Sequence, residues 1–170
     1  ITGGRLMLLM KASNKQLKRT EFVENLANVI HRHAINPRQV VIEITEEVIN
    51  TDPLAIENAI YHLHEKNMLV CLENYGYGRG YIDYFRRKMI DIIKIDPRLT
   101  RHLQEQSGES AYIKALMAMA DHLGILVIIA GLETKAQLQQ ATSLGAEMGQ
   151  GYILDTPLRP DELTEKLRHN

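Results

Sequence analysis

Short apolar runs alternate along the chain with longer segments in which apolar residues recur every third or fourth position. The apolar runs are too short for helices and show no polar alternation, so they predict strands that are buried on both faces. These predicted strands are Arg5–Met10, Val40–Ile44, Met68–Leu72, Asp91–Ile93 and Ile125–Ile129. Strands of this kind are typical of a parallel sheet covered by helices.

The segments between the apolar runs carry the signals of amphipathic helices. Apolar residues at four-residue spacing predict a helix over Lys18–Ala34. Asp52 is a good N-cap and Pro53 suits the first helical position, so a second helix is expected to begin there. Further helices are predicted from Ile113 to Leu123 before Gly124, from Thr134 to Leu144, and over Pro160–Arg168.

This alternation of strands and helices predicts an α/β fold with a parallel sheet. Strands that are apolar throughout need helices on one side and packed side chains on the other, which a closed or nearly closed barrel provides. An open, doubly wound sheet is the alternative, because the sequence does not tell whether the last strand returns to the first.

Polar residues follow the predicted strands, at the point where each strand ends. In a parallel barrel these ends lie on one face, where barrel enzymes hold their chemistry. The polar residues in question are Glu43, Glu46, Glu73, Asn74, Lys94 and Glu133. Any single acid of this kind can simply cap the next turn. The repetition at strand after strand favours a site.

Composition and charge exclude several classes of partner. The chain has 170 residues and a net charge of −1, so it has no broad basic field for a nucleic acid polymer or an anionic membrane. No apolar run approaches membrane length, and no signal peptide opens the sequence. The single cysteine, Cys71, excludes an internal disulfide and argues for a reducing cytoplasm. A membrane anchor elsewhere in a full-length protein stays open.

Length bears on the domain organisation. The whole chain, residues 1–170, is expected to form one domain. A complete eight-fold barrel usually needs about 250 residues, whereas this sequence opens at Ile1 on what already resembles a strand. We therefore expect a partial barrel, truncated at its N-terminal side, from the C-terminal part of a larger protein.

Six motifs in order resemble one family. They are KASNKQL, VIEITEE, LENYGYGRGY, IIKID, IAGLE and GQGYILDTPL. Together they resemble the bacterial EAL domain, the phosphodiesterase that linearises cyclic di-GMP, over nearly all of the chain. The resemblance implies a TIM-like (β/α)8 barrel of the EAL type. The family's N-terminal segment, with its Glu-Ala-Leu signature and a metal-ligating glutamate, has no counterpart here.

The resemblance also implies two divalent cations, Mg²⁺ or Mn²⁺, held by carboxylates and an amide. At these positions the sequence departs from the family. Lys11 replaces an asparagine ligand, Glu73 and Asn74 replace paired aspartates, and Ala130 replaces a glutamate, while Glu43 is retained. The metal site is therefore expected to be a remnant of Glu43 and Glu73. No cofactor is expected, and Mg²⁺ or Mn²⁺ would be needed only if the site were active.

Four further family positions survive. They are Glu46, Lys94, Glu133 and Gln150, of which Lys94, Gln150 and Glu133 are the candidate ligand-binding residues. Lys94 is either a phosphate-binding lysine or an ion-pair partner. Glu43 and Glu46 are either remnants of a ligand shell or the partners of Lys11 and Lys94. We further hypothesise that Lys11 forms an internal ion pair with Glu43 and Glu73.

The glycine-rich segment after the third strand resembles the EAL-family loop that couples dimerisation to the site. The resemblance therefore implies a homodimer through a loop that contains Tyr75, Tyr77, Arg79 and Tyr81. The alternative is an exposed tyrosine-rich turn without a partner.

Three functions of different class remain open. The favoured one is a degenerate, non-catalytic EAL domain that regulates or senses cyclic di-GMP, in a protein that also carries a GGDEF diguanylate cyclase domain. The second is an active phosphodiesterase with an altered metal site. The third is a protein-binding adaptor that no longer binds nucleotide.

Overall fold

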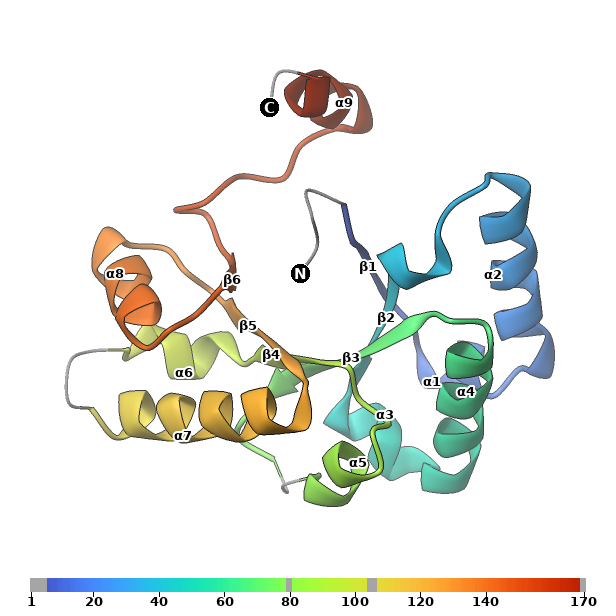
Figure 1. Cartoon of the computed structure of the whole chain (residues 1–170), viewed down its shortest axis with the longest axis horizontal. Coiled ribbons are helices and arrows are strands. Elements are labelled where there is room, and N and C mark those ends of the chain that lie inside the picture. The colour runs from blue at the N-terminus through green and yellow to red at the C-terminus, as the bar shows by residue number, and fades with distance from the viewer. Residues whose placement is uncertain (1–5, 79–80, 104–106, 169–170) are drawn as a thin grey trace.

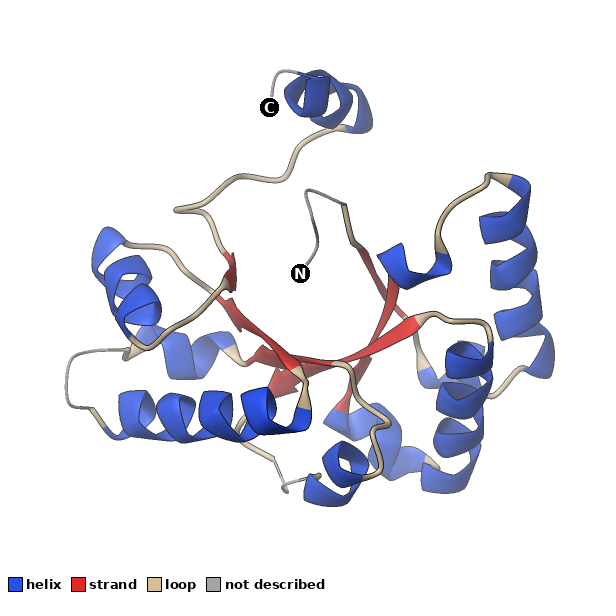
Figure 2. Cartoon of the chain, viewed as in Figure 1, coloured by secondary structure: helices blue, strands red, loops and turns tan. Residues whose placement is uncertain are grey.

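The computed structural model describes residues 6–78, 81–103 and 107–168. Its strands form one parallel sheet in sequence order, from β1 to β6. The strands are β1 Leu8–Lys11, β2 Val40–Thr45, β3 Leu69–Tyr75, β4 Ile92–Ile95, β5 Leu126–Ala130 and β6 Met148–Gln150. Figures 1 and 2 show that the sheet curls, with the helices on its outer side except for the C-terminal helix, which stands on the open side of the curl.

The sequential strand order decides between the two predicted architectures. In a doubly wound sheet the strand order reverses at a switch point, whereas here each strand lies beside the next one in the chain. The prediction of a truncated TIM-like barrel is confirmed, and the open doubly wound alternative is wrong. Within the described residues the sheet has six strands, fewer than the eight of a complete barrel.

The helices fill the segments between the strands. They are α1 Asn14–Leu17, α2 Thr20–Arg32, α3 Glu46–Thr51, α4 Pro53–Glu65, α5 Ile82–Arg86, α6 Pro97–Arg101, α7 Gly108–Leu123, α8 Lys135–Ser143 and α9 Pro160–Arg168, with a 3₁₀ turn at Pro37–Gln39. None of the described helices is long and apolar enough to cross a bilayer. Helix α9 stands away from the other helices, beyond β6 (Figure 1).

Two clusters of apolar side chains pack on the two faces of the sheet. The inner face carries Val41, Cys71, Ile92 and Ile128, all buried. The outer face packs against the helices through residues such as Ile42, Leu72 and Ile93, which are also fully buried. This two-sided burial explains why the strands read as continuous apolar runs.

The predicted helix ends agree well with the structure. Asp52 caps α4 by accepting a hydrogen bond from the Ala55 amide at 3.3 Å, with Pro53 in the first turn. Thr134 opens α8 with a capping box to Gln137. Gly124 ends α7 in the left-handed region, at φ 72°.

Several boundaries differ from the sequence prediction. The helix expected over Lys18–Ala34 is α2, which is slightly shorter and runs over Thr20–Arg32. The short helix α1, which Ser13 opens with a capping box, precedes it and was not predicted. The first strand runs over Leu8–Lys11, and Arg5 lies outside the described residues. The third strand continues through Glu73 and Asn74 to Tyr75.

Candidate functional site

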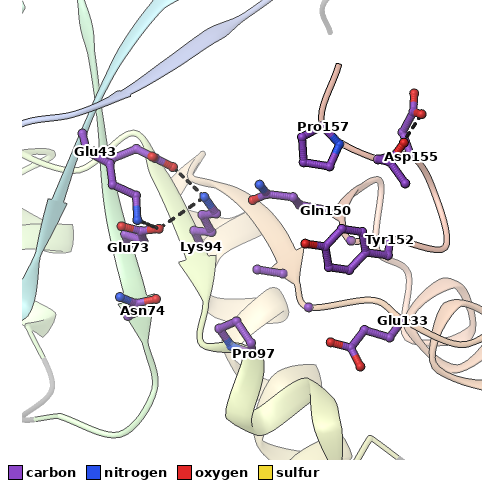
Figure 3. Close-up of a pocket in the computed structure, with 15 residues that line it drawn as sticks. Glu43, Glu73, Asn74, Lys94, Pro97, Glu133, Gln150, Tyr152, Asp155 and Pro157 are labelled. Atoms are coloured by element: carbon purple, nitrogen blue, oxygen red, sulfur yellow. Dashed lines mark hydrogen bonds and ion pairs between the residues drawn. The ribbon is translucent and has the colours of Figure 1, made fainter. Parts of the chain in front are cut away.

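A cavity of about 680 Å³ opens at the C-terminal ends of the strands. Figure 3 shows its two walls: the ends of β2, β3 and β4 carry Glu43, Glu73 and Lys94, and the opposite wall comes from Glu133 and the segment after β6. Polar residues at strand ends therefore meet at one face, as the strand pattern predicts. Lys11, Asn74 and Ala130 also line this cavity.

Lys94 lies at the centre of the first wall. Its ammonium Nζ is 2.8 Å from Glu43 Oε1 and 3.4 Å from Glu73 Oε1 (Figure 3). All three side chains are at most 8% exposed. Burial alone would lower the pKa of Lys94, but the hydrogen bond to Glu43 and the charges of Glu43 and Glu73 outweigh it and hold that pKa above its usual value. Lys94 is therefore a charged, internally paired lysine.

Lys11 extends this group of charges toward solvent. Its Nζ is 3.0 Å from Glu73 Oε1, and its side chain is 72% exposed. The structure thus brings Lys11 to Glu73, as hypothesised, but the partner of Glu43 is Lys94 and not Lys11. We call Lys11, Glu43, Glu73 and Lys94 the two-lysine cluster. Its two ammonium groups balance two carboxylates, so its formal charge is zero.

The residues at the family's metal positions do not fit a pair of divalent cations. The carboxylates of Glu43 and Glu73 already accept hydrogen bonds from Lys94. Ala130 offers no side-chain donor atom, and Asn74 lies apart from the Lys94 ammonium (Figure 3). Across the described part of the chain, no three His, Cys, Asp or Glu side chains converge as a metal site requires.

Asn74 owes its position to an irregularity in β3. The pairing with β4 shifts register between Leu72 and Tyr75, and Asn74 has a φ of 57°, in the left-handed region. Asparagine tolerates this conformation better than most residues. The bulge turns Asn74 out of the alternation that places Cys71 and Glu73 on the inner face.

The second wall of the cavity differs from the first. Glu133 and Gln150 are exposed, and Tyr152 is 68% exposed. The backbone amide of Glu133 donates to Gln137 Oε1 at 2.9 Å, which ties the residue to the start of α8. The sequence analysis did not assign Tyr152, Asp155, Thr156 or Pro157 to the site, because the strand that precedes them, β6, was not predicted; the motif GQGYILDTPL, which contains all four, was the usable signal.

Glu46 lies outside the cavity lining, under the glycine-rich segment. A Cβ at Gly78 would collide with its carboxylate, so only glycine permits this approach. Tyr81 donates a hydrogen bond from its hydroxyl to the Glu46 backbone carbonyl at 3.2 Å. Burial, with a smaller contribution from Asp96, raises the pKa of Glu46. Within the described residues Glu46 pairs with neither Lys11 nor Lys94.

The remaining loop residues have different surroundings. Tyr75 is 7% exposed and packs edge-on against Phe85, so it belongs to the core. Tyr77 is 53% exposed, and the Arg98 guanidinium lies 4.4 Å from its ring centroid. Arg79 lies outside the described residues. Dimerisation through this segment stays a prediction.

The fold is that of a known class. The EAL domain family matches residues 3–157, and the chain belongs to it. The EAL domain of Mycobacterium smegmatis DcpA superimposes with a TM-score of 0.87 at 24% identity, over 96% of this chain and 73% of that one. The predicted EAL-type fold is therefore confirmed.

Two curated relatives are named as cyclic di-GMP phosphodiesterases. Over 96% of its length the chain is 26% identical to the cyclic di-GMP phosphodiesterase PA2567 of Pseudomonas aeruginosa. It is 25% identical, over 92% of its length, to the bifunctional diguanylate cyclase/cyclic di-GMP phosphodiesterase MucR of the same organism. The chain spans only 28% and 23% of the lengths of these two relatives.

Proposed function

We propose that this EAL domain binds cyclic di-GMP without hydrolysing it and acts as a regulatory module. The observation that carries the proposal is the two-lysine cluster, in which Lys94 and Lys11 neutralise the carboxylates of Glu43 and Glu73. Relatives support the ligand class: the MucR phosphodiesterase, 25% identical to this chain, has been solved in complex with c-di-GMP at a TM-score of 0.84.

The argument against hydrolysis is electrostatic. In the family, the metal ions would lower the pKa of a bound water and stabilise the charge that develops on the phosphate. A lysine ammonium has no open coordination position, so it cannot make a nucleophile from water in this way. Lys11 also puts a positive charge beside Glu73, only 3.0 Å away, where a cation would have to bind.

The argument for binding rests on the same residues. Because the two-lysine cluster is neutral in sum, a phosphodiester anion does not face unpaired carboxylates there. The Lys11 ammonium contacts Glu73, but its side chain is 72% exposed, so it is accessible to a phosphate oxygen in the cavity. Gln150 lines the same cavity and offers both a donor and an acceptor to the ligand.

The test is a calorimetric titration with cyclic di-GMP, in EDTA and then in magnesium or manganese, followed by chromatography of the nucleotide. We expect binding that does not depend on the metal, and no linear product. Lys11→Ala should weaken binding, whereas Lys15→Ala, at an exposed position on α1 outside the cavity, should not.

Two other results would replace the proposal. Turnover with either metal that Glu43→Gln abolishes would establish an active phosphodiesterase with an altered metal site. No binding to the correctly folded chain, with or without metal, would favour a protein-binding adaptor.

The proposal extends to the whole protein. The printed name of MucR combines cyclase and phosphodiesterase activities in one protein, which supports a GGDEF domain beside this EAL domain in a cytoplasmic signalling protein. A homodimer through the segment that contains Tyr77 and Tyr81 is part of the same proposal. Sedimentation of the wild type and of Tyr77→Ala would test it: an unchanged monomer in both would remove the dimer.

A further inference from the structure

Helices α2 and α4 are neighbours on the outer side of the sheet (Figure 1), and three adjoining cavities follow their junction. The cavity volumes are about 420, 410 and 360 Å³. The first and second cavities share Thr20, Val23 and His62, and the second and third share Lys66. We call this row of cavities the α2–α4 groove. None of its lining residues lines the cavity at the strand ends, so it is a separate surface feature.

The floor of the groove is apolar. It includes four side chains from α1, α2 and α4 that are each 4% exposed: Leu17, Val23, Ile30 and Ala59. Two exposed apolar residues stand on α4 beside the groove, Leu54 at 71% and Tyr61 at 62%. Each directly precedes a lining residue, Ala55 or His62, and the seven-residue spacing puts both on one face of α4. The groove therefore combines a buried apolar floor with an exposed apolar rim.

The end of the groove at the start of α2 is basic. The cavity there is lined by Lys18 and Arg19 and by no acidic side chain. Lys18 Nζ pairs with Asp52 Oδ2 at 2.9 Å. Arg19 makes no capping hydrogen bond with its side chain, and no carboxylate of the described residues pairs with it. Further along, Lys66 and Glu24 pair at 2.8 Å. The Arg19 guanidinium is thus available to an acidic group of a partner.

The shape of the groove favours a protein helix over a membrane surface. Proteins bind the membrane interface through apolar residues that enter the lipid, whereas the apolar floor here is recessed between two helices. A groove of this kind accepts an amphipathic helix, whose residues at i, i+3, i+4 and i+7 rest on the floor. Helix α2 has 13 residues and is about 20 Å long, so its length matches roughly three turns of a docked helix.

We propose that the α2–α4 groove binds an amphipathic helix of a partner domain, with apolar residues on the floor against Tyr61 and a carboxylate on Arg19. Glu65 lines the middle cavity, so the acidic residues of the partner helix belong at the Arg19 end. The inference goes beyond the proposed function, because it assigns a protein partner to a surface away from the nucleotide.

The probe for this surface is a fluorescent synthetic helix of 13 residues, the length of α2. It carries leucines at three- and four-residue spacing and glutamates at one end. Fluorescence anisotropy should show saturable binding of this peptide to the chain. The same peptide with lysines in place of the glutamates should bind about fivefold more weakly, because it loses the ion pair with Arg19.

Variants on each side of the groove test the two kinds of contact. Arg19→Glu should weaken binding of the acidic peptide about fivefold, whereas Lys114→Glu, an equal charge change at an exposed position of α7, should not. Tyr61→Ala should weaken binding about 10-fold, as the loss of an aromatic anchor does. Its control is Tyr152→Ala, which removes a tyrosine of similar exposure, 68%, outside the groove.

Two further measurements locate the contact and test the other class of partner. Amide hydrogen exchange should slow in α2 and α4 on addition of the acidic peptide, and not in α7. Sedimentation with phosphatidylserine vesicles tests a membrane surface, and we expect the chain to stay in the supernatant. Thermal melting of each variant separates a local loss of binding from unfolding.

The outcomes separate this inference from the proposed function. The inference is overturned if the folded chain does not bind the acidic peptide, or if Arg19→Glu and Tyr61→Ala bind it as the wild type does. Sedimentation with vesicles in place of peptide binding would also overturn it. Arg19→Glu and Tyr61→Ala should bind cyclic di-GMP as the wild type does, so either proposal can fail while the other stands.

Discussion

The two walls of the cavity differ in how their side chains are bonded. On the first wall, Glu43, Glu73 and Lys94 are at most 8% exposed and pair with one another. On the second wall, Gln150 and Tyr152 are exposed, and Tyr152 points into open space (Figure 3). A buried charge that loses its partner destabilises the fold, so the paired groups of the first wall are constrained by stability, whereas exposed groups on a fixed backbone are available to a ligand.

This difference changes what mutations are expected to report. Substitutions of the buried residues on the first wall should alter the free energy of unfolding, whereas substitutions of exposed residues around the cavity, Lys11 included, should alter binding while the fold remains. The predictions below use chemical denaturation and start with the largest expected loss of stability; all of them test this division except that for Arg98, a residue outside the cavity lining.

Lys94→Met should be the most destabilising change. It leaves Glu43 and Glu73 buried without the ammonium that both contact, at 2.8 and 3.4 Å. Removing one partner of a buried ion pair costs about 3–5 kcal/mol. Urea denaturation at neutral pH measures the loss, and Lys114→Met at an exposed position of α7 provides the control.

The double variant Lys94→Met/Glu43→Met sharpens the first prediction. Apolar replacement of a whole buried pair is often neutral, so the double variant should regain much of the stability that the single variant loses. A single variant as stable as the wild type would show that the first wall is not structural.

Arg98→Ala should have an intermediate effect that depends on pH. Asp96, buried at the end of β4, accepts hydrogen bonds from Arg98 Nε at 3.0 Å and Nη2 at 2.6 Å. The Arg98 side chain holds the pKa of Asp96 below its usual value. A depressed carboxyl pKa stabilises the fold above the unfolded pKa, about 3.9, and this contribution is lost as pH falls through the folded pKa.

Denaturation at neutral and at acidic pH measures this linkage. The wild type should be more stable than Arg98→Ala at neutral pH, and the difference should shrink below the usual pKa of an aspartate. A difference that stays constant over this range would mean that the Arg98 side chain contributes through packing on Tyr77, and not through the charge of Asp96.

Lys11→Ala should lower the free energy of unfolding by less than Lys94→Met or Arg98→Ala. Its side chain is 72% exposed, and Glu73 keeps its contact with Lys94. Exposed ion pairs contribute roughly 0.2–1 kcal/mol. The variant should thus unfold close to the wild type but bind cyclic di-GMP more weakly. A loss of stability as large as that of Lys94→Met would mean that Lys11, like Lys94, mainly stabilises the fold.

Gln150→Ala should have the smallest effect on stability. The residue is exposed at the end of β6, and such surface substitutions usually change the free energy of unfolding by less than about 0.5 kcal/mol. A larger loss, measured by the same denaturation, would remove the distinction between the two walls.

The sequence predicts the strands well and their ends less well. The apolar runs mark β2, β4 and β5 to within about two residues, because burial on both faces requires apolar side chains throughout. The predicted third strand ended at Leu72, where the apolar run ends. β3 continues through the polar residues Glu73 and Asn74, with a bulge and a positive φ at Asn74 that the apolar pattern does not reveal. β6 escaped prediction because Met148–Gln150 is short and contains glycine.

The members of the site were predictable, but their pairing was predictable only in part: the contact of Lys11 with Glu73 was expected, whereas a contact of Lys11 with Glu43 was expected and is not formed. Strand ends alone bring Glu43, Glu73 and Lys94 together. Lys11 and Glu43 are direct neighbours across β1 and β2, and yet the Lys11 ammonium contacts Glu73 on the next strand. Side-chain reach across a curled sheet decides such pairings, and no sequence pattern encodes it. Tyr152 was missed because β6, the strand that brings it to the cavity, escaped prediction.

Because Cys71 is buried, the reaction of its thiol with a reagent reports local opening of the sheet. This thiol is the single one in the sequence, and it lies on the inner face of β3 with no exposed surface. Burial also raises the pKa of the Cys71 thiol, which suppresses its reaction in the closed state. A thiol-reactive dye therefore labels the chain only when the middle of the sheet opens, and the labelling rate measures the free energy of that opening without any engineered probe.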